Sequence, residues 1–255
     1  MIYVCIPSHN EAQTVGLLLW KIRQVFTDFP REYQFLVGDD ASTDATREVL
    51  EPYAKVLPLE VIRNRERQGT ARTVEGLLKL ALERTDRPKR DAAVVLHADF
   101  THAVTVLPEL IKKLDSGADL VVAEGTVSGA EPRGYRWFRR WGSHLLPRAA
   151  RIPGVRDGLS GFLAVRLACL RGALRASGDR LLHLDGWAGR AELLARLGRQ
   201  SRRTDVVSAP ERLDLRERAS RIDPWDEAKA LWRARGALKD LPPALRAGDR
   251  TDDAA

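Results

Sequence analysis

Apolar runs alternate with helical patterns through the first 125 residues, and this alternation constrains the fold more than any other feature. Five short runs have the apolar character of buried strands, and apolar residues recur at helical spacing in the segments between them. The expected strands are residues 2–6, 33–38, 57–62, 92–96 and 118–123, and the expected helices are residues 11–26, 42–53, 70–84 and 107–114. Strands joined by helices of this length form a mostly parallel sheet with helices on both faces. The sequence therefore predicts an α/β fold.

The pattern changes after residue 125. Residues 159–165 are apolar, helices are expected at 189–197 and 226–241, and a strand is expected at 206–209. We expect Trp225 and Trp232, at the last of these helices, to pack against the core. These features predict an α/β domain over residues 1–222, a helical extension over 223–246 and a disordered tail over 247–255.

Composition is that of a soluble globular protein. The chain of 255 residues is 44% hydrophobic and 30% charged, which excludes wholesale disorder and a fibrous protein. It has no run of about 18 to 20 uncharged apolar residues and no basic leader before residues 2–6. Cys5 and Cys169 are too few for a disulfide framework. These features favour a cytoplasmic location.

Positive charge is concentrated in the second half of the chain. Residues 129–255 hold 26 Lys and Arg against 16 Asp and Glu, and 24 of the 26 are Arg. Arg suits phosphate contacts and anionic lipid surfaces, although a codon preference would give the same overall bias. Since no nucleic-acid-binding motif accompanies the charge, we expect no nucleic-acid partner.

Polar clusters follow three of the expected strands, where ligands bind in parallel α/β sheets. They are Pro7-Ser8-His9-Asn10-Glu11, Asp39-Asp40-Ala41-Ser42-Thr43-Asp44 and His97-Ala98-Asp99. No GxGxxG or GxxxxGK[ST] loop is present, so the usual glycine-rich phosphate cradles are excluded. Carboxylates at strand ends instead indicate a divalent cation that neutralises a diphosphate.

These clusters resemble the signature segments of family 2 glycosyltransferases of the GT-A fold. Residues 6–11, 38–46 and 97–99 match segments that read P-x-x-N-E, V-D-D-x-S-x-D-x-T and D-x-D in that family. Residues 107–110, 117–121 and 157–162 are similar to the branch that contains dolichol- and polyprenyl-phosphate mannose and glucose synthases. Ala209-Pro210, followed by Arg216 and Ser220-Arg221, is similar to the C-terminal R-x-x-G-x-S-K element of that branch, with one residue fewer.

The resemblance implies a role for each matching residue. Residues of the first two segments would line the nucleotide pocket of a sugar donor, with Asp40 on the base or ribose: Pro7, Asn10, Glu11, Asp39 and Asp40. Asp99 would hold the Mg²⁺ or Mn²⁺ that bridges the donor diphosphate. Later residues would shape the sugar and acceptor end or contact phosphate groups: Ser160, Gly161, Arg216 and Arg221.

The sequence departs from the family pattern at Glu124-Gly125, where this branch often has an Arg, and at two positions of the metal region. His97 stands at the first Asp of D-x-D, and Thr101 stands where this branch has a second metal-contacting Gln. A metal held by Asp99 and His97 would favour Mn²⁺, because Mg²⁺ prefers oxygen ligands. A supporting role for His97, outside the metal shell, is the alternative.

The expected chemistry follows from charge. The leaving nucleotide diphosphate develops negative charge, which a metal and Arg216 would stabilise. A hydroxyl acceptor needs a carboxylate base, for which Asp157 and Asp99 are candidates. A lipid phosphate is already ionised at about pH 7 and needs mainly positioning and charge screening.

Residues 133–146 interleave Trp and Arg, and residues 131–156 contain seven Arg and one acidic residue. Such a stretch suits peripheral contact with the inner face of a cell membrane. We therefore predict an inverting, metal-dependent transfer of a hexose from a GDP- or UDP-sugar to an acceptor, a polyprenyl phosphate. Two alternatives stay open: transfer to a soluble or cell-envelope hydroxyl, and a non-catalytic sugar-nucleotide-binding protein, which the departures at His97 and Thr101 motivate.

Overall fold

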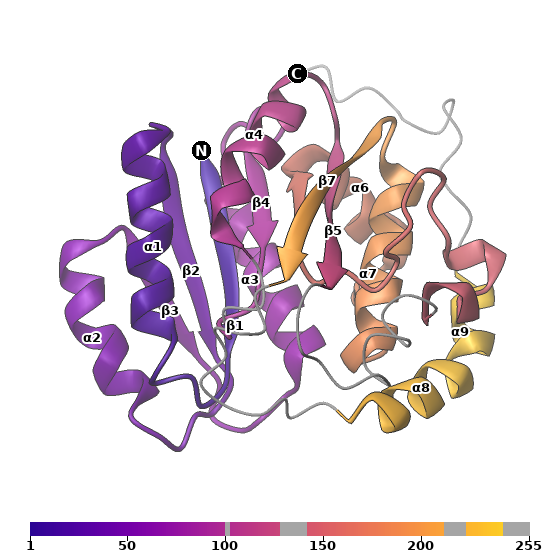
Figure 1. Cartoon of the computed structure of the whole chain (residues 1–255), viewed down its shortest axis with the longest axis horizontal. Helices are drawn as coiled ribbons and strands as arrows, with labels where there is room; N and C mark the ends of the chain where they lie inside the picture. The colour runs from indigo at the N-terminus through magenta and orange to yellow at the C-terminus, as the bar shows by residue number, and fades with distance from the viewer. Residues whose placement is uncertain (100–102, 128–141, 212–222, 242–255) are drawn as a thin grey trace.

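A seven-stranded sheet forms the middle layer of the molecule, with helices on both of its faces (Figure 1). The computed structural model describes residues 1–99, 103–127, 142–211 and 223–241. The strands are β1 (Ile2–Ser8), β2 (Tyr33–Asp39), β3 (Leu59–Arg63), β4 (Ala92–Val95), β5 (Leu120–Val127), β6 (Leu163–Arg166) and β7 (Thr204–Glu211). They lie in the order β3-β2-β1-β4-β6-β5-β7, and β6 runs antiparallel to both of its neighbours. The expected mostly parallel sheet is confirmed.

Helices cover the two faces in separate groups. The helices are α1 (Val15–Asp28), α2 (Thr46–Val56), α3 (Thr70–Arg84), α4 (Leu107–Asp115), α6 (Leu167–Ser177), α7 (Gly186–Gln200), α8 (Pro224–Arg233) and α9 (Arg235–Lys239), with short 3-10 turns at Val104–Val106, Gly142–Leu145 and Arg148–Ala150. Helices α1, α2 and α4 share one buried cluster with the sheet, and α3, α6 and α7 share another. The sheet therefore has the two covered faces that the alternation predicts.

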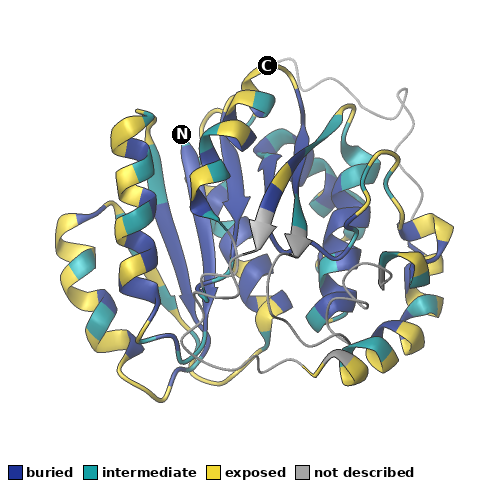
Figure 2. Cartoon of the chain, in the orientation of Figure 1, coloured by how far each residue is buried: buried dark blue, intermediate teal, exposed yellow. Residues whose placement is uncertain are grey.

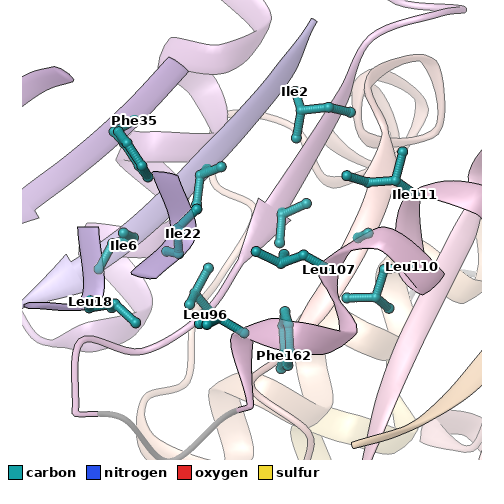
Figure 3. Close-up of a cluster of buried hydrophobic side chains, with 14 of the residues drawn as sticks. Ile2, Ile6, Leu18, Ile22, Phe35, Leu96, Leu107, Leu110, Ile111 and Phe162 are labelled. Atoms are coloured by element: carbon teal, nitrogen blue, oxygen red, sulfur yellow. The ribbon is translucent and has the colours of Figure 1, made fainter. Parts of the chain in front are cut away.

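The strands sort their side chains by strict alternation. Ile2 and Ile6 of β1 join the cluster under α1 and α4, whereas Tyr3 and Cys5 join the cluster under α3. Figure 3 shows Ile2 and Ile6 among residues of the first cluster, with Phe35 from the neighbouring strand. A strand that is buried on both faces reads as a continuous apolar run, which is why β1 was recognisable in the sequence.

Two helical segments differ from expectation. Helix α6 follows β6 without a turn between them, so one apolar stretch passes from strand to helix with no breaker to mark the change. The segment expected as one helix at 226–241 is two, α8 and α9. Its tryptophans are not in the core: Trp225 is 65% exposed and Trp232 is 59% exposed, because Leu231 and Leu238 occupy the buried face. The expected packing of the two tryptophans is therefore wrong.

The chain order of the strands creates a switch point beside β1. From β1 the chain proceeds to β2 and β3 on one side, and then crosses to β4 on the other side. Ligands of such sheets bind outside the carboxyl ends of the strands at this point. The ends of β1, β2 and β4 are therefore where the candidate site is to be sought.

Candidate active site

The loops that follow β1 and β2 are joined side by side. The backbone N–H of Asn10 donates to Ser42 Oγ (2.9 Å), and the N–H of Thr43 donates to Asn10 Oδ1 (2.7 Å). The N–H of Glu11 donates to Thr46 Oγ1 (2.9 Å). Short polar side chains at these positions replace the hydrogen bonds that loop backbone lacks. The two signature segments therefore form one unit.

Two residues of this unit have left-handed backbone. The φ angle is 54° at both Asn10 and Ala41. Asn tolerates this conformation, whereas for Ala it costs about 1 to 2 kcal/mol. Ala41 follows Asp40 directly, so the strain lies in the turn that aims the acidic pair.

Asp40 holds the loop that precedes α3. Its Oδ1 accepts from Asn64 Nδ2 (2.8 Å) and from the N–H of Gln68 (2.8 Å), and its Oδ2 accepts from the N–H of Gly69 (2.9 Å). Asp39 is 1% exposed and accepts a backbone N–H from its own loop at 3.0 Å. Both carboxylates thus fix loops at the edge of the sheet, and a contact of Asp40 with a base or ribose stays a prediction.

Pro7 and Glu11 lie at the two ends of the first loop. The pairing of β1 with β4 ends at Cys5, so Pro7, which has no N–H, stands past the last pair on that side. The Glu11 side chain is 8% exposed, and its Oε2 accepts from Thr14 Oγ1 at 3.0 Å. Glu11 therefore ties the loop to the start of α1, and its nucleotide contact also stays a prediction.

Asp99 emerges at the same edge of the sheet as Asp40. The N–H of Leu96 donates to the carbonyl of Cys5 (3.2 Å), which continues the β4 strand toward His97 and Asp99. Strands β2 and β4 flank β1 and run parallel to it, so they lie about 10 Å apart. The structure thus brings the two acidic segments to one edge, on opposite sides of β1.

Gly161 brings a third group to this edge. A Cβ on Gly161 would lie 2.4 Å from His97 Nε2 and 3.2 Å from Arg190 Cζ. Only glycine leaves room for both side chains at this point. Sequence reasoning missed Arg190, because it stands in a helical pattern with no motif around it and reaches the edge only through the packing of α7.

Asp157 and Ser160 stabilise the turn before β6. Asp157 accepts the N–H of Gly125 (3.3 Å) and of Leu159 (3.2 Å) through its two oxygens. Ser160 is 2% exposed, and its hydroxyl donates to the carbonyl of Ala123 at 2.6 Å. These bonds attach the turn to β5, and the catalytic role of Asp157 and the sugar contact of Ser160 stay predictions.

Acidic side chains that sequence reasoning missed hold the segment between α6 and α7. Glu75 accepts the backbone N–H groups of residues 181 and 182 at 3.0 Å each. Glu192 accepts those of residues 183 and 184 at 2.8 and 2.9 Å. Asp185 accepts the N–H of the second residue of α3 at 2.9 Å. The start of α7, which carries Arg190, is therefore fixed against α3.

Other predicted residues lie outside the part of the chain that the structure describes. They are Arg216, Arg221, Thr101 and residues 133–141 of the Arg- and Trp-rich segment. Their phosphate, metal and membrane roles stay predictions.

The described residues fit a divalent cation that is shared with substrate phosphates better than one that is held by protein side chains alone. Among them, no three His, Cys, Asp or Glu side chains gather as a metal-binding group. Asp99 and His97 offer a carboxylate and an imidazole, and Arg190 lies close to that imidazole. A divalent cation that is held largely by substrate phosphates needs only one or two protein ligands. The donor set therefore fits Mg²⁺ or Mn²⁺ that is shared with a bound diphosphate.

The parallel sheet and the polar loops at its switch point define a nucleotide-binding α/β domain. The sequence model described as "Glycosyl transferase family 2" matches residues 3–182. The chain belongs to glycosyl transferase family 2.

Curated relatives match part of the chain. It is 26% identical over 165 residues to a bactoprenol glucosyl transferase of Shigella phage SfX, which covers 63% of this chain and 50% of that protein. It is 31% identical over 119 residues to an uncharacterized protein of Methanocaldococcus jannaschii, which covers 46% of this chain and 48% of that protein. The chain thus spans about half the length of the curated relatives it matches.

Solved structures share the fold over nearly the whole chain. TarS 1-349 of S. aureus superposes with a TM-score of 0.60 at 17% identity, over 97% of this chain and 67% of that one. Glucosyl-3-phosphoglycerate synthase of Mycobacterium tuberculosis, in complex with Mn²⁺, UDP and glucosyl-3-phosphoglycerate, gives 0.60 at 21% identity, over 93% and 78%. The fold is GT-A, as the sequence signatures predict.

Proposed function

We propose that this chain transfers a hexose from a nucleotide-diphosphate sugar to the phosphate of a polyprenyl lipid, with inversion and with the help of a divalent cation. One observation carries the proposal: the loop unit around Asp40 and the segment from His97 to Asp99 lie at one edge of the sheet, on either side of β1. A separation of about 10 Å between β2 and β4 suits a donor whose nucleoside lies on one side and whose diphosphate and sugar lie on the other.

The donor class is supported by the solved structures of the same fold. TarS 1-349 is described in complex with UDP-GlcNAc, and the mycobacterial synthase in complex with Mn²⁺ and UDP. In this chain Asp99, with His97 beside it, would hold the cation, which supplies positive charge to the leaving diphosphate. A UDP- and a GDP-sugar both remain candidates.

The class of acceptor is inferred from the contacts of Asp157, the carboxylate nearest in sequence to the expected sugar end. Asp157 holds the turn before β6 through a backbone N–H on each carboxylate oxygen, which favours a structural role over that of a base for a hydroxyl. A phosphate acceptor needs no such base. The sequence similarity to bactoprenol glucosyl transferases supports a lipid-phosphate acceptor independently. Transfer to a hydroxyl is therefore the second candidate.

Helix α8 supplies a surface for membrane contact. Trp225 and Trp232 of α8 are exposed, and the guanidinium of Arg235, the first residue of α9, stacks over the Trp232 ring at 4.5 Å. Figure 2 shows that the outer side of α8 is exposed along its length. Indole rings and guanidinium groups suit the headgroup region of an anionic bilayer. No helix in the described part of the chain is long and apolar enough to span a bilayer. We propose reversible binding at the inner face of the cell membrane, through α8 together with residues 133–146.

A donor screen tests the function. Thermal unfolding is followed with GDP-mannose, UDP-glucose, UDP-galactose and UDP-GlcNAc, each with and without Mn²⁺, and the donor that stabilises most is then incubated with polyprenyl phosphate. We expect release of the nucleoside diphosphate and a glycosylated lipid. Binding without release from any donor would favour the non-catalytic alternative. Release only with a hydroxyl acceptor, by a protein that ignores liposomes, would favour the second candidate.

A further inference from the structure

The loop before α3 is held from two sides by carboxylates. Asp40, directly after β2, accepts the backbone N–H groups of Gln68 and Gly69 at 2.8 and 2.9 Å. Asp185, directly before α7, accepts the N–H of Ala71 at 2.9 Å. Two segments far apart in the sequence therefore fix one short stretch of backbone beside the carboxyl end of β2, where the nucleotide is proposed to bind.

Gly69 lets Asp185 approach this loop closely. The φ angle of Gly69 is 92°, and a Cβ at this position would overlap Oδ2 of Asp185. Only glycine combines this backbone conformation with room for the carboxylate. One oxygen of Asp185 thus binds the first turn of α3, and the other lies against the residue that precedes the helix.

Glu227 of α8 holds the chain next to Asp185. Its Oε2 accepts the N–H of Trp187 at 2.8 Å. Gly186, between Asp185 and Trp187, has a φ angle of 58°, and a Cβ there would lie 2.5 Å from Glu227 Oε2. The Trp187 side chain is 1% exposed and belongs to one buried cluster with Leu231 of α8. A carboxylate and a packed ring therefore attach α8 to the first turn of α7.

Both helix starts, of α3 and of α7, are bound by a carboxylate from another element. The first N–H groups of a helix have no partner within the helix, and an Asp at the N-cap usually accepts from its own helix. Asp185 occupies the N-cap of α7 but makes no such bond there, and it binds the start of α3 instead. Glu227 takes its place at the start of α7. The contacts therefore form one series, from α8 through the start of α7 to the start of α3.

We propose that Asp185 and Glu227 are positioning residues for the sugar donor, through which α8 holds the loop that Asp40 binds in the conformation that receives the nucleotide. The inference rests on the proposed function, because it takes this edge of the sheet to bind the nucleotide of a sugar donor. The two carboxylates act through the loop and not on the reacting atoms. Loss of either therefore weakens donor binding and leaves the rate of transfer at saturation nearly unchanged.

The experiment measures donor binding and stability on the same variants. Calorimetry with UDP and GDP in the presence of Mn²⁺ gives the nucleotide affinity, steady-state kinetics give KM and kcat for the donor, and urea denaturation gives the free energy of unfolding. We expect Asp185→Ala to weaken nucleotide binding by about fivefold or more and to raise KM by the same factor. Asp185→Asn, which keeps an acceptor oxygen, should lose less. Should Asp185→Ala fail to fold by circular dichroism, Asp185→Asn is judged by the same measurements.

The double variant tests whether the two residues act in series. Glu227→Ala should weaken nucleotide binding less than Asp185→Ala, because it acts through Asp185. If so, the variant with both changes binds nucleotide no more weakly than Asp185→Ala alone. Two losses that multiply in the double variant would overturn the series.

Asp119→Ala is the matched control. Asp119 accepts the backbone N–H of Arg202 at the same 2.9 Å, but it stands directly before β5, at the opposite edge of the sheet. Asp119 is 8% exposed, whereas Asp185 is exposed, so the control should lose at least as much stability. Its nucleotide affinity should equal that of the wild type.

The outcomes separate the two proposals. If the wild type binds nucleotide and Asp185→Ala binds it equally well, or Asp119→Ala loses as much affinity, the inference is overturned and the proposed function stands. If the wild type binds no nucleotide and transfers no sugar, the proposed function fails and the inference falls with it.

Discussion

On both sides of the candidate site acidic side chains hold loop backbone, but only one side adds a close meeting of side chains from distant segments. On the side that is proposed to bind the nucleotide, here called the nucleotide side, which comprises the loops after β1 and β2, acidic and amide side chains accept hydrogen bonds from the backbone of neighbouring loops. On the transfer side, which comprises the end of β4, the turn before β6 and α7, His97 and Arg190 converge on one glycine. The first side is therefore held mainly by its own hydrogen bonds. The second side gathers groups whose chemistry suits a charged substrate. The comparison indicates that the acidic residues of the family's signature segments divide their roles: Asp40 holds a loop, whereas Asp99 is proposed to take part in the chemistry.

The largest expected effect separates these roles. Asp99→Ala is expected to lower release of nucleoside diphosphate from the donor by about a thousandfold, because the cation on the leaving group loses its carboxylate ligand. The melting temperature should change little. Steady-state kinetics with Mn²⁺ and circular dichroism measure the two quantities, with the exposed Asp86→Ala as control. Retained turnover would place the cation elsewhere.

Asp40→Ala is expected to act chiefly on stability. The change removes the acceptor of three hydrogen bonds from the loop before α3, and we expect a loss of about 3 kcal/mol in the free energy of unfolding. Denaturation in urea measures the loss, and Asp40→Asn, which keeps an acceptor oxygen, should lose less. If Asp40→Ala were as stable as the wild type and only failed to bind nucleotide, the contrast between the two sides would disappear.

The same contrast decides what the sequence could predict. The helix at 70–84 is observed as predicted, because its apolar periodicity is local and a glycine precedes it. The placement of the first two signature segments at one edge of the sheet was predictable for a similar reason, because each directly follows a strand that the local pattern identifies. Their contact with a nucleotide stays a prediction. The meeting of His97, Gly161 and Arg190 was not predictable, because residues so far apart in the chain meet only once β6 and α7 are packed. Local patterns carry no information on that packing.

Low pH tests how the segment between α6 and α7, next to the transfer side, is held by Glu75. Burial alone would raise the pKa of Glu75, but hydrogen bonds from Lys79 and from the backbone of residues 181 and 182 outweigh it, so the pKa lies below its ordinary value. A carboxyl group of this kind stabilises the fold above its unfolded pKa, and the contribution is lost as the pH falls through the folded pKa.

Glu75→Gln is therefore expected to lower the free energy of unfolding by about 2 kcal/mol at neutral pH. The difference in this free energy between wild type and variant should narrow below about pH 4. Urea denaturation at a series of pH values measures the gap, and the other carboxyl groups cancel from it because both proteins share them. A gap that stayed constant with pH would show that the carboxylate charge is not what holds the segment between α6 and α7.

Glycine substitutions give the smallest and sharpest comparison. Gly38 lies in β2 just before the acidic pair, and a Cβ there would lie 2.4 Å from Thr73 Cγ2 and 3.4 Å from Leu77 Cδ1, both in α3. A Cβ on Gly76, which is itself in α3, would meet nothing within 4 Å. We expect Gly38→Ala to cost about 1 to 2 kcal/mol by overpacking and Gly76→Ala to gain about 0.5 to 1 kcal/mol from helix propensity. Urea denaturation measures both.

Because Gly38 lies under the nucleotide side, its variant should lose stability at all ligand concentrations. Gly161→Ala on the transfer side, whose Cβ would displace His97 and Arg190, should instead lower the rate of sugar transfer with a smaller loss of stability. Equal losses of stability at both glycines would mean that the transfer side, too, is primarily architectural.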